Sequence, residues 1–302
     1  MKLPVDPRAL FDSLRDLRSR TRTPPATVDS GRDPIVRRMD FGFTNPELDF
    51  PKHWMGGSVL GTAITNGMNL LFPEGERFFV RSVRYYMDEL EDPQLRAQVQ
   101  RFFGQEGQHA RSHQQYMEVL TRQGYDLDAF LKPYKRVAFG IIEPAAPKVL
   151  CLSITAALEH FTATFAEAAL SERFFDELAP PAMAELLLWH AAEEIEHKDV
   201  AFEVLRQIDD RYSVRIAGLV AACILLWAFW TAATLSLLAQ EKELDPKRLV
   251  QEWLSAVRSG RTGGTKMRRA FLSYLEPGFH PANTGNDELA LAYLEEIGRR
   301  AG

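Results

Sequence analysis

The sequence predicts an all-α protein, and two observations carry that prediction. Apolar residues in almost every long segment recur with the period of a helix and do not alternate as they do in strands. No two alternating segments are joined by an Asn-Gly or Asp-Gly turn of the kind that marks a β-hairpin. The 302 residues, 46% of them apolar and 25% charged, are enough for one large domain or two small ones.

The two ends of the chain are expected to differ from its middle. Residues 1–45 contain a short amphipathic helix and the Pro-rich stretch "TRTPPATVDSGRDP", which is typical of a linker or a surface arm. Residues 46–212 are expected to form a helical bundle. Residues 213–302 are expected to add a long apolar helix and a helical C-terminal tail.

Local signals place the helices in order. A helical pattern runs from Ser58 to about Leu90, and Pro73 within it should either kink the helix or occupy the first turn of a new one. Asp92 and Pro93 are typical of an N-cap and a first helical position. That helix is expected to end at Gly124, and further helices are expected at 146–172, at 181–208 and after the N-cap Asp245.

One segment is long and uncharged. Residues 216–240, "IAGLVAACILLWAFWTAATLSLLAQ", contain 25 residues without a charged side chain. About 20 apolar residues suffice to cross a bilayer. Lysine and arginine flank both ends, so the positive-inside rule does not orient the segment. We favour a buried or homodimer-interface helix and keep membrane association through 216–240 as the alternative.

Composition and charge exclude nucleic-acid binding as the function. The formal net charge is −5, and no block of lysine and arginine dominates the sequence. The two cysteines, Cys151 and Cys223, lie in apolar helical contexts and form no CxxC pair, which fits a reducing compartment. The first residues lack the apolar region of a secretory signal, so we expect a cytoplasmic location, with membrane association left open.

Two helical segments each carry a Glu-x-x-His pair. The first pair is Glu106 with His109, and the second is Glu194 with His197. Because successive residues of a helix are about 100° apart, both members of a pair project from one helix face. A two-metal site in a helical bundle takes one such pair from each of two helices and a single Glu from each of two others.

The two single glutamates are present on the segments that precede the paired ones. Glu76 and Glu159 both lie in apolar surroundings next to phenylalanine, alanine or leucine. The separations also agree, with 30 residues from Glu76 to Glu106 and 35 from Glu159 to Glu194. The sequence therefore predicts a centre for two metal ions held by Glu76, Glu106, His109, Glu159, Glu194 and His197.

Three further histidines have candidate roles at this centre. His190 precedes Glu194 by four residues and is predicted to be a seventh ligand. His113 shares the face of the first pair, either as a ligand or as a histidine that orients a carboxylate. His160 points about 100° away from its neighbour Glu159, so we expect it to orient a ligand or to pack in the core.

Two glutamates are alternatives to the predicted ligands. Glu193 lies four residues before His197 and competes with Glu194, but the repeated Glu-x-x-His spacing favours Glu194. Glu74 competes with Glu76. Its position beside a proline favours a first-turn residue that the helix dipole stabilises.

These motifs carry a resemblance to a known family. The sequence resembles the predicted metal-dependent hydrolases, a ferritin-like helical family of bacteria, over roughly residues 35–260. The resemblance rests on "VRRMDFGF", "FPEGERFF", "GQEGQHARSHQQ", "ALEHFTATFAE" and "WHAAEEIEHKDVAFEV". It implies a ferritin-like bundle with a metal site.

A more distant similarity links the chain to the di-iron arylamine N-oxygenases. In that family an extra histidine lies four residues before the glutamate of the second pair, and His190 stands in this place. His113 departs from the pattern. The similarity implies seven ligands, namely Glu76, Glu106, His109, Glu159, His190, Glu194 and His197.

The donor set indicates the chemistry that we expect. Carboxylates and imidazoles without thiolate suit two iron ions, with manganese as the alternative. We expect a di-iron oxygenase or oxidase that uses O₂ as co-substrate to oxidise an apolar or aromatic small molecule. The sequence has no flavin or Fe–S motif, so a separate reductase would supply electrons. The alternatives are a hydrolase that uses a metal-bound water and a metal-binding protein without catalysis.

Overall fold

Helices account for the regular structure of this protein. The computed structural model describes residues 34–258 and 264–301, and no β-strand occurs among them. The predicted all-α class is therefore confirmed. The predicted N-terminal amphipathic helix and almost all of the Pro-rich stretch lie outside the described residues.

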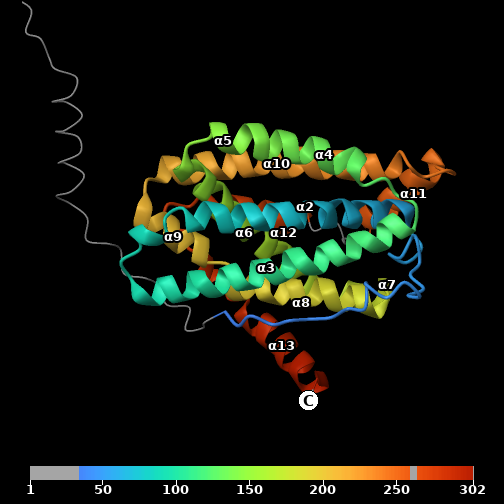
Figure 1. Cartoon of the computed structure of the whole chain (residues 1–302), viewed down its shortest axis with the longest axis horizontal. Coiled ribbons are helices and arrows are strands. Elements are labelled where there is room, and N and C mark those ends of the chain that lie inside the picture. The colour runs from blue at the N-terminus through green and yellow to red at the C-terminus, as the bar shows by residue number, and fades with distance from the viewer. Residues whose placement is uncertain (1–33, 259–263, 302) are drawn as a thin grey trace, which may run out of the picture.

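Four long helices lie lengthwise beside one another and form the bundle (Figure 1). They are α2 (Val59–Arg84), α3 (Pro93–Arg122), α6 (Lys148–Glu172) and α8 (Pro181–His197). Helix α2 packs on α3, and α6 packs on α8. These are the four helices that carry the predicted metal ligands, so the bundle brings the ligands toward one interior.

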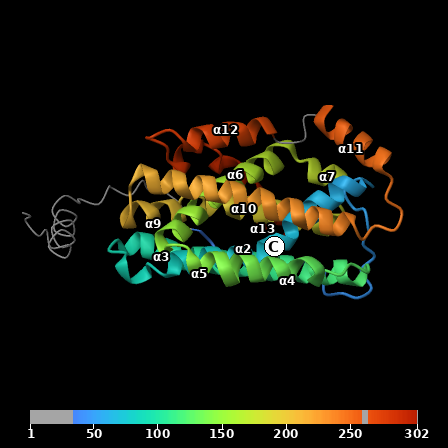
Figure 2. The ribbon, with the colours of Figure 1, turned by 90° about the horizontal axis from the view of Figure 1, so that it is seen from above.

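Shorter elements connect and cover the bundle. Helix α10 packs against both α2 and α6, and Figure 2 shows it running between α4 and α5 on one side and α11 and α12 on the other. The element bounds are η1 (Met87–Glu89), α4 (Asp128–Val137), the π-helical turn η2 (Ala138–Ile142), α5 (Glu143–Ala145), α7 (Phe174–Leu178), α9 (Val200–Ile208), α10 (Tyr212–Leu238), α11 (Pro246–Arg258), α12 (Gly264–Tyr274), η3 (Pro281–Thr284) and α13 (Asp287–Ala301).

The bundle interior contains two large apolar clusters with polar residues between them. One cluster surrounds Tyr116 and Trp189, and the other surrounds Phe102 and Phe161. Along α3, the pair at Glu106 and His109 lies between Phe102 of one cluster and Tyr116 of the other. The two clusters therefore enclose the predicted ligands and keep water from this part of the bundle.

Several predicted helix starts are confirmed by their caps. The side chain of Asp92 accepts a hydrogen bond from the Gln94 N–H, and that of Asp245 accepts one from the Lys247 N–H. Helix α3 ends just before Gly124, whose φ of 92° favours glycine.

Two predicted boundaries are wrong. Helix α2 continues through Pro73, so no new helix begins there, and it ends at Arg84, before the predicted end near Leu90. Packing against α3 and α10 holds the chain helical at this proline. The predicted helix 181–208 divides into α8 and α9 at residues 198–199. At this break Lys198 is buried, and its Nζ donates hydrogen bonds to Asn286 and Asp287.

Two helices among the described residues are long and apolar enough to cross a membrane by length and composition, namely α6 and α10. In their most apolar windows, 67% of the residues of α6 are buried inside the protein, but only 22% of those of α10. Helix α6 is therefore a core helix of the bundle. Helix α10 contacts the bundle with one face and leaves the other exposed.

Candidate metal centre

The seven predicted ligands come from the four bundle helices, and all are buried. Helix α2 carries Glu76, and α3 carries Glu106 and His109. Helix α6 carries Glu159, and α8 carries His190, Glu194 and His197. Their exposed fractions lie between 0% and 4%. Buried carboxylates need hydrogen bonds, ion pairs or metal ions, and four of them lie here with three histidines in one interior.

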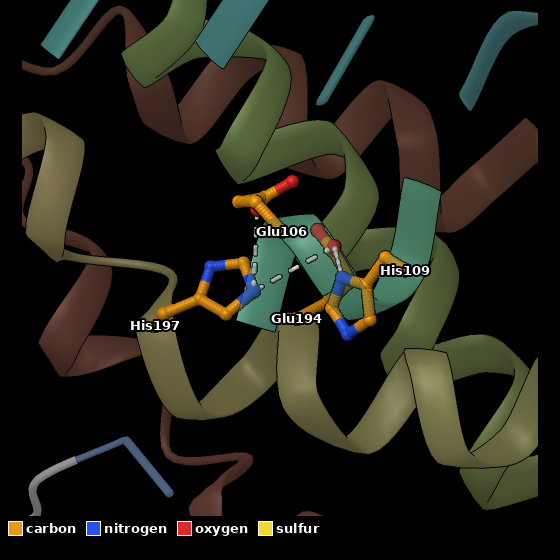
Figure 3. A group of neighbouring side chains, drawn as sticks. All are labelled: Glu106, His109, Glu194 and His197. Atoms are coloured by element: carbon orange, nitrogen blue, oxygen red, sulfur yellow. Dashed lines mark ion pairs between the residues drawn. The ribbon is translucent and has the colours of Figure 1, made fainter. Parts of the chain in front are cut away.

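The two Glu-x-x-His pairs meet face to face. One donor atom from each of Glu106, His109, Glu194 and His197 lies within 4.8 Å of the others (Figure 3). His109 Nδ1 is 3.6 Å from Glu194 Oε1, and His197 Nε2 is 3.5 Å from Glu106 Oε1. The helical spacing predicted that each pair shares a face. The packing of α3 and α8 brings the two faces together.

A second group of donors adjoins the first. Donor atoms of Glu76, His109 and His190 also lie within 4.8 Å of one another. His190 Nε2 is 2.8 Å from Glu194 Oε1 and 3.7 Å from Glu76 Oε1. Glu194 thus contacts members of both groups.

Glu159 lies beside these groups and belongs to neither. Its Oε2 is 2.9 Å from His197 Nδ1, and its Oε1 has no hydrogen-bond partner among the described residues. The structure therefore places Glu159 next to a predicted ligand, with one oxygen still available for a cation.

The orphaned donor atoms fit metal ions. Buried polar atoms in proteins are almost always hydrogen-bonded. Here several such atoms have no hydrogen-bond partner in the described part of the chain. They are both oxygens of Glu76 and of Glu106, one oxygen of Glu194, His109 Nδ1 and His197 Nε2. Carboxylate oxygens and imidazole nitrogens that converge without partners are the donors that divalent metal ions use.

The electrostatics of the site also favour bound cations. Burial, together with the charge of neighbouring glutamates, raises the pKa of Glu76 and Glu106 well above its ordinary value. Burial raises the pKa of Glu159 to about 7. Burial opposes the ionisation of Glu194, but His197, His190 and His109 outweigh it and lower its pKa to about 2. Without a cation, the raised pKa of Glu76, Glu106 and Glu159 favours their protonated forms, and a bound cation would favour the ionised forms.

Glu193 contacts the outer side of a ligand. Its Oε2 is 3.1 Å from His109 Nε2, while its Oε1 accepts hydrogen bonds from Trp189 Nε1 and from Arg37. His109 therefore has Nδ1 toward the donor groups and Nε2 toward a carboxylate, an arrangement that fixes a metal-binding histidine in place. The structure puts Glu194 in the donor groups and Glu193 behind His109.

Sequence reasoning missed Arg37. Its guanidinium donates hydrogen bonds to Glu193 and to Glu196, and Gln105 also donates to Glu196. Arg37 and Glu193 are 156 residues apart, so no local spacing links them. The only sequence signal was the inclusion of Arg37 in the stretch "VRRMDFGF".

His113 belongs to a hydrogen-bonded chain behind His190. The amide of Asn69 donates to Thr65 O, so its Oδ1 accepts from His113 Nδ1 at 2.7 Å. His113 Nε2 then accepts from His190 Nδ1 at 2.6 Å. The other ring nitrogen of His190, Nε2, faces Glu76 and Glu194, so His113 orients His190.

His160 is a packing histidine. Its Nε2 lies 3.0 Å from Ala270 O on α12, and its ring packs against Tyr274 and Phe279. Burial lowers its pKa to about 4. Of the two alternatives for His160, the structure selects packing.

Glu74 lies inside the continuous α2 and pairs with Arg77 and Lys135, so the first-turn prediction for it is wrong.

An apolar pocket adjoins the donor groups. Glu76 and Glu194 line it, and most of the other lining residues are phenylalanine, leucine, isoleucine, methionine and alanine from α2, α6, η2 and α10. A mostly apolar lining with a few polar groups is typical of small-molecule sites, and two of the predicted ligands belong to this lining.

The comparison with protein families agrees with the site. Residues 35–285 match the family described as predicted metal-dependent hydrolase. The chain belongs to this family. The matched range contains all seven predicted ligands as well as Arg37, and the resemblance inferred from the motifs is confirmed. No curated protein and no solved structure matched the chain. The family and the buried cluster of glutamate and histidine together indicate a metal-dependent protein.

Proposed function

We propose that this chain is a two-metal enzyme that oxidises a small apolar molecule with O₂. The observation that carries the proposal is the meeting of two Glu-x-x-His pairs, from α3 and α8, with Glu76 on α2 and Glu159 on α6 beside them. Ferritin-like proteins that bind two iron or two manganese ions use this combination of residues on four helices.

The donor groups support iron as the metal. Carboxylate and imidazole donors suit iron and manganese, and neither cysteine is a member of the two donor groups. Two reduced iron ions held by these residues would supply the activation of O₂. The electrons would come from a separate reductase, which is a required partner under this proposal.

The surrounding residues of the chain would bind the substrate and hold the ligands. The apolar pocket would orient a hydrocarbon or aromatic group toward Glu76 and Glu194, and its walls would exclude water. Glu193 and Arg37 would hold the ring of His109, while Asn69 and His113 would fix the tautomer of His190. Fixed ligands and a dry cavity are the parts that a protein contributes to metal chemistry.

Hydrolysis is the second candidate, and the family's description supports it more directly than oxidation. Two metal ions can supply a water of lowered pKa and stabilise the charge that develops on a carbonyl or phosphoryl oxygen. In this case the pocket would hold the apolar part of an ester or amide, with the scissile bond near Glu76 and Glu194. Both candidates use the same site and the same apolar substrate class.

One experiment separates the two candidates. The protein is loaded with Fe(II) without oxygen, its metal content is counted, and its optical and Mössbauer spectra are followed after O₂ is added. We expect about two iron ions per chain and rapid loss of the ferrous signal. The variant Glu106→Ala, which lacks a predicted ligand, is the control for oxidation of loosely bound iron.

The opposite result would support hydrolysis. Iron that stays ferrous in oxygen, together with metal-dependent cleavage of long-chain p-nitrophenyl esters by the zinc- or manganese-loaded protein, would overturn the oxidative proposal. Protein that retains no metal after dialysis would overturn both.

A further inference from the structure

The outer face of α10 is exposed and almost entirely apolar. Residues Val220, Ile224, Trp227, Thr231 and Leu235 recur at helical spacing and are exposed, with Ile224 63% and Leu235 58% accessible. No charged residue occurs between Arg215 and Glu241. The face is about 22 Å long. A helix on the surface of a water-soluble protein normally turns polar residues outward, so this face requires a partner.

The opposite face of α10 is held by the bundle. An ideal Cβ placed on Gly218 would lie 2.0 Å from Ser153 Oγ on α6, and one placed on Gly67 of α2 would lie 2.6 Å from Thr234 Oγ1 of α10. Trp230 Nε1 also donates a hydrogen bond to Ile64 O of α2. Because α10 is packed this closely along the bundle, it offers its outer face to a partner surface and does not stand free as a spanning helix.

Helix α11 follows α10 and repeats the pattern. None of its residues is buried, and Val250, Trp253, Leu254 and Val257 form one exposed apolar stripe at the spacing of a helix face. At about 100° per residue, Lys247 and Arg258 border this stripe, and Arg258 is exposed. A basic amphipathic helix with tryptophan on its apolar face is typical of helices that lie in a membrane interface.

Charge distinguishes this part of the chain from the rest. The whole chain has a formal net charge of −5. Between Pro246 and Tyr274 the only acidic residue is Glu252, against seven basic residues, namely Lys247, Arg248, Arg258, Arg261, Lys266, Arg268 and Arg269. Anionic lipid headgroups complement such a segment, whereas a second copy of the same basic segment would repel it.

The apolar pocket lies beneath the same surface. Leu225, Leu226 and Phe229 of α10 line the pocket on one side, and residues of η2 line it on another. The outward neighbours of these residues are exposed, namely Ile224 on α10 and Ile141 on η2. The turn η2 has no buried residue and is π-helical, a geometry that often occurs at functional sites.

We propose that the outer face of α10 and the apolar stripe of α11 dock on an anionic lipid bilayer, with α10 in the plane of the membrane. We further propose that a lipid-dissolved alkyl chain enters the pocket between α10 and η2. The proposed docking is argued only from the exposed apolar surfaces of α10 and α11. The identity of the alkyl chain as a substrate rests on the function proposed above.

Flotation with vesicles tests the docking. The full chain is mixed with vesicles of phosphatidylcholine alone or of equal parts phosphatidylcholine and phosphatidylglycerol, and bound protein is measured after centrifugation. We expect binding to the anionic vesicles and weaker binding in high salt. The double variants Ile224→Asn/Trp227→Asn and Trp253→Ala/Leu254→Ala should each reduce binding by about tenfold or more.

The controls separate docking from folding and from catalysis. Tyr85→Ser removes an exposed aromatic side chain at the end of α2, far along the sequence from this surface, and should bind vesicles like the natural chain. Metal content and thermal midpoint should be unchanged in the double variants, because the substituted side chains are exposed. Flotation is measured with metal-free protein as well, so failure of the proposed reaction leaves this result unaffected.

Two outcomes would overturn the docking. One is the absence of flotation with both kinds of vesicle. The other is a stable dimer in solution that the same double variants dissociate, because this surface would then join two copies of the chain.

A fluorescent alkyl probe tests the entry of a lipid chain. We expect dansylaminoundecanoic acid to bind the natural protein, with or without metal, and to lose its affinity by about tenfold in Leu226→Trp, which fills the pocket below the surface. Vesicle binding by Leu226→Trp should be unchanged. Equal probe affinity in both proteins would overturn the proposed pocket entry.

Discussion

At the scale of single residues, Glu194 links the two donor groups. Its Oε1 lies 2.8 Å from His190 Nε2, 3.6 Å from His109 Nδ1 and 3.7 Å from His197 Nε2. Glu194 would thus help to hold a metal ion in either donor group. We therefore expect Glu194→Gln to lose both ions during gel filtration, as measured by metal analysis, while Glu185→Gln, earlier on the same helix, retains them. Full metal content in Glu194→Gln would contradict a role of Glu194 in both donor groups.

Glu193 does not belong to the donor groups and contacts one of their members, His109. It holds His109 Nε2 at 3.1 Å, and removal of such a partner typically weakens metal binding by about 10–100-fold. We expect a loss of this size in Glu193→Gln, measured by competition with a metal-binding dye. Glu196→Gln alters a partner of Arg37 and leaves the contact between Glu193 and His109 in place, so it should lose less. Equal losses would show that the Arg37 pairs, and not the contact with His109, matter.

At the scale of elements, small residues allow α10 to approach the bundle. A Cβ on Gly218 would lie 2.5 Å from the Ser153 backbone carbon, so an alanine there must push α10 away from α6. We expect Gly218→Ala to lower the free energy of unfolding by about 1–3 kcal/mol in urea denaturation. Gly107 on α3 has no atom within 4 Å of its ideal Cβ, so Gly107→Ala should leave stability unchanged or raise it by up to about 1 kcal/mol. Equal stability of both variants would contradict the close contact.

At the scale of the whole molecule, the protonation of the buried acids makes the stability of the fold depend on pH and on bound metal. Burial raises the pKa of Glu159 and of Glu193 to about 7, and that of Glu76 and Glu106 well above the ordinary value. Burial lowers the pKa of His197, but Glu159 and Glu194 outweigh it and raise this pKa to about 9. A group with a raised pKa in the folded state loses its contribution to stability as pH rises through that pKa.

Above the ordinary pKa of histidine, each of these groups lowers the stability of the folded state as pH rises. We therefore expect the thermal midpoint of the metal-free protein to fall from about pH 6.5 to 9. Bound metal takes the place of the protons, so the loaded protein should be more stable and depend less on pH. Differential scanning calorimetry of both forms at several pH values measures this. A metal-free protein that gains stability over this range would contradict the assignment of buried protonated acids.

The sequence by itself determined the all-α class, the helix caps at Asp92 and Asp245, and the pairing of Glu106 with His109 and of Glu194 with His197. These features are local, because a helix sets the direction of residues three or four positions apart whatever surrounds it. The apolar surroundings of Glu76 and Glu159 also indicated that both side chains are buried, where a glutamate needs a partner.

Only the tertiary structure decided the contacts between distant segments. Arg37 and Asn69 lie behind ligands on other elements, and nothing in their local sequence indicates those partners. Packing keeps α2 helical through Pro73 and directs His160 to Ala270 on α12. It also leaves the outer face of α10 exposed. An apolar helix has the same sequence pattern in a core, an interface or a membrane, and the neighbours that distinguish these environments are known only once the helices are packed.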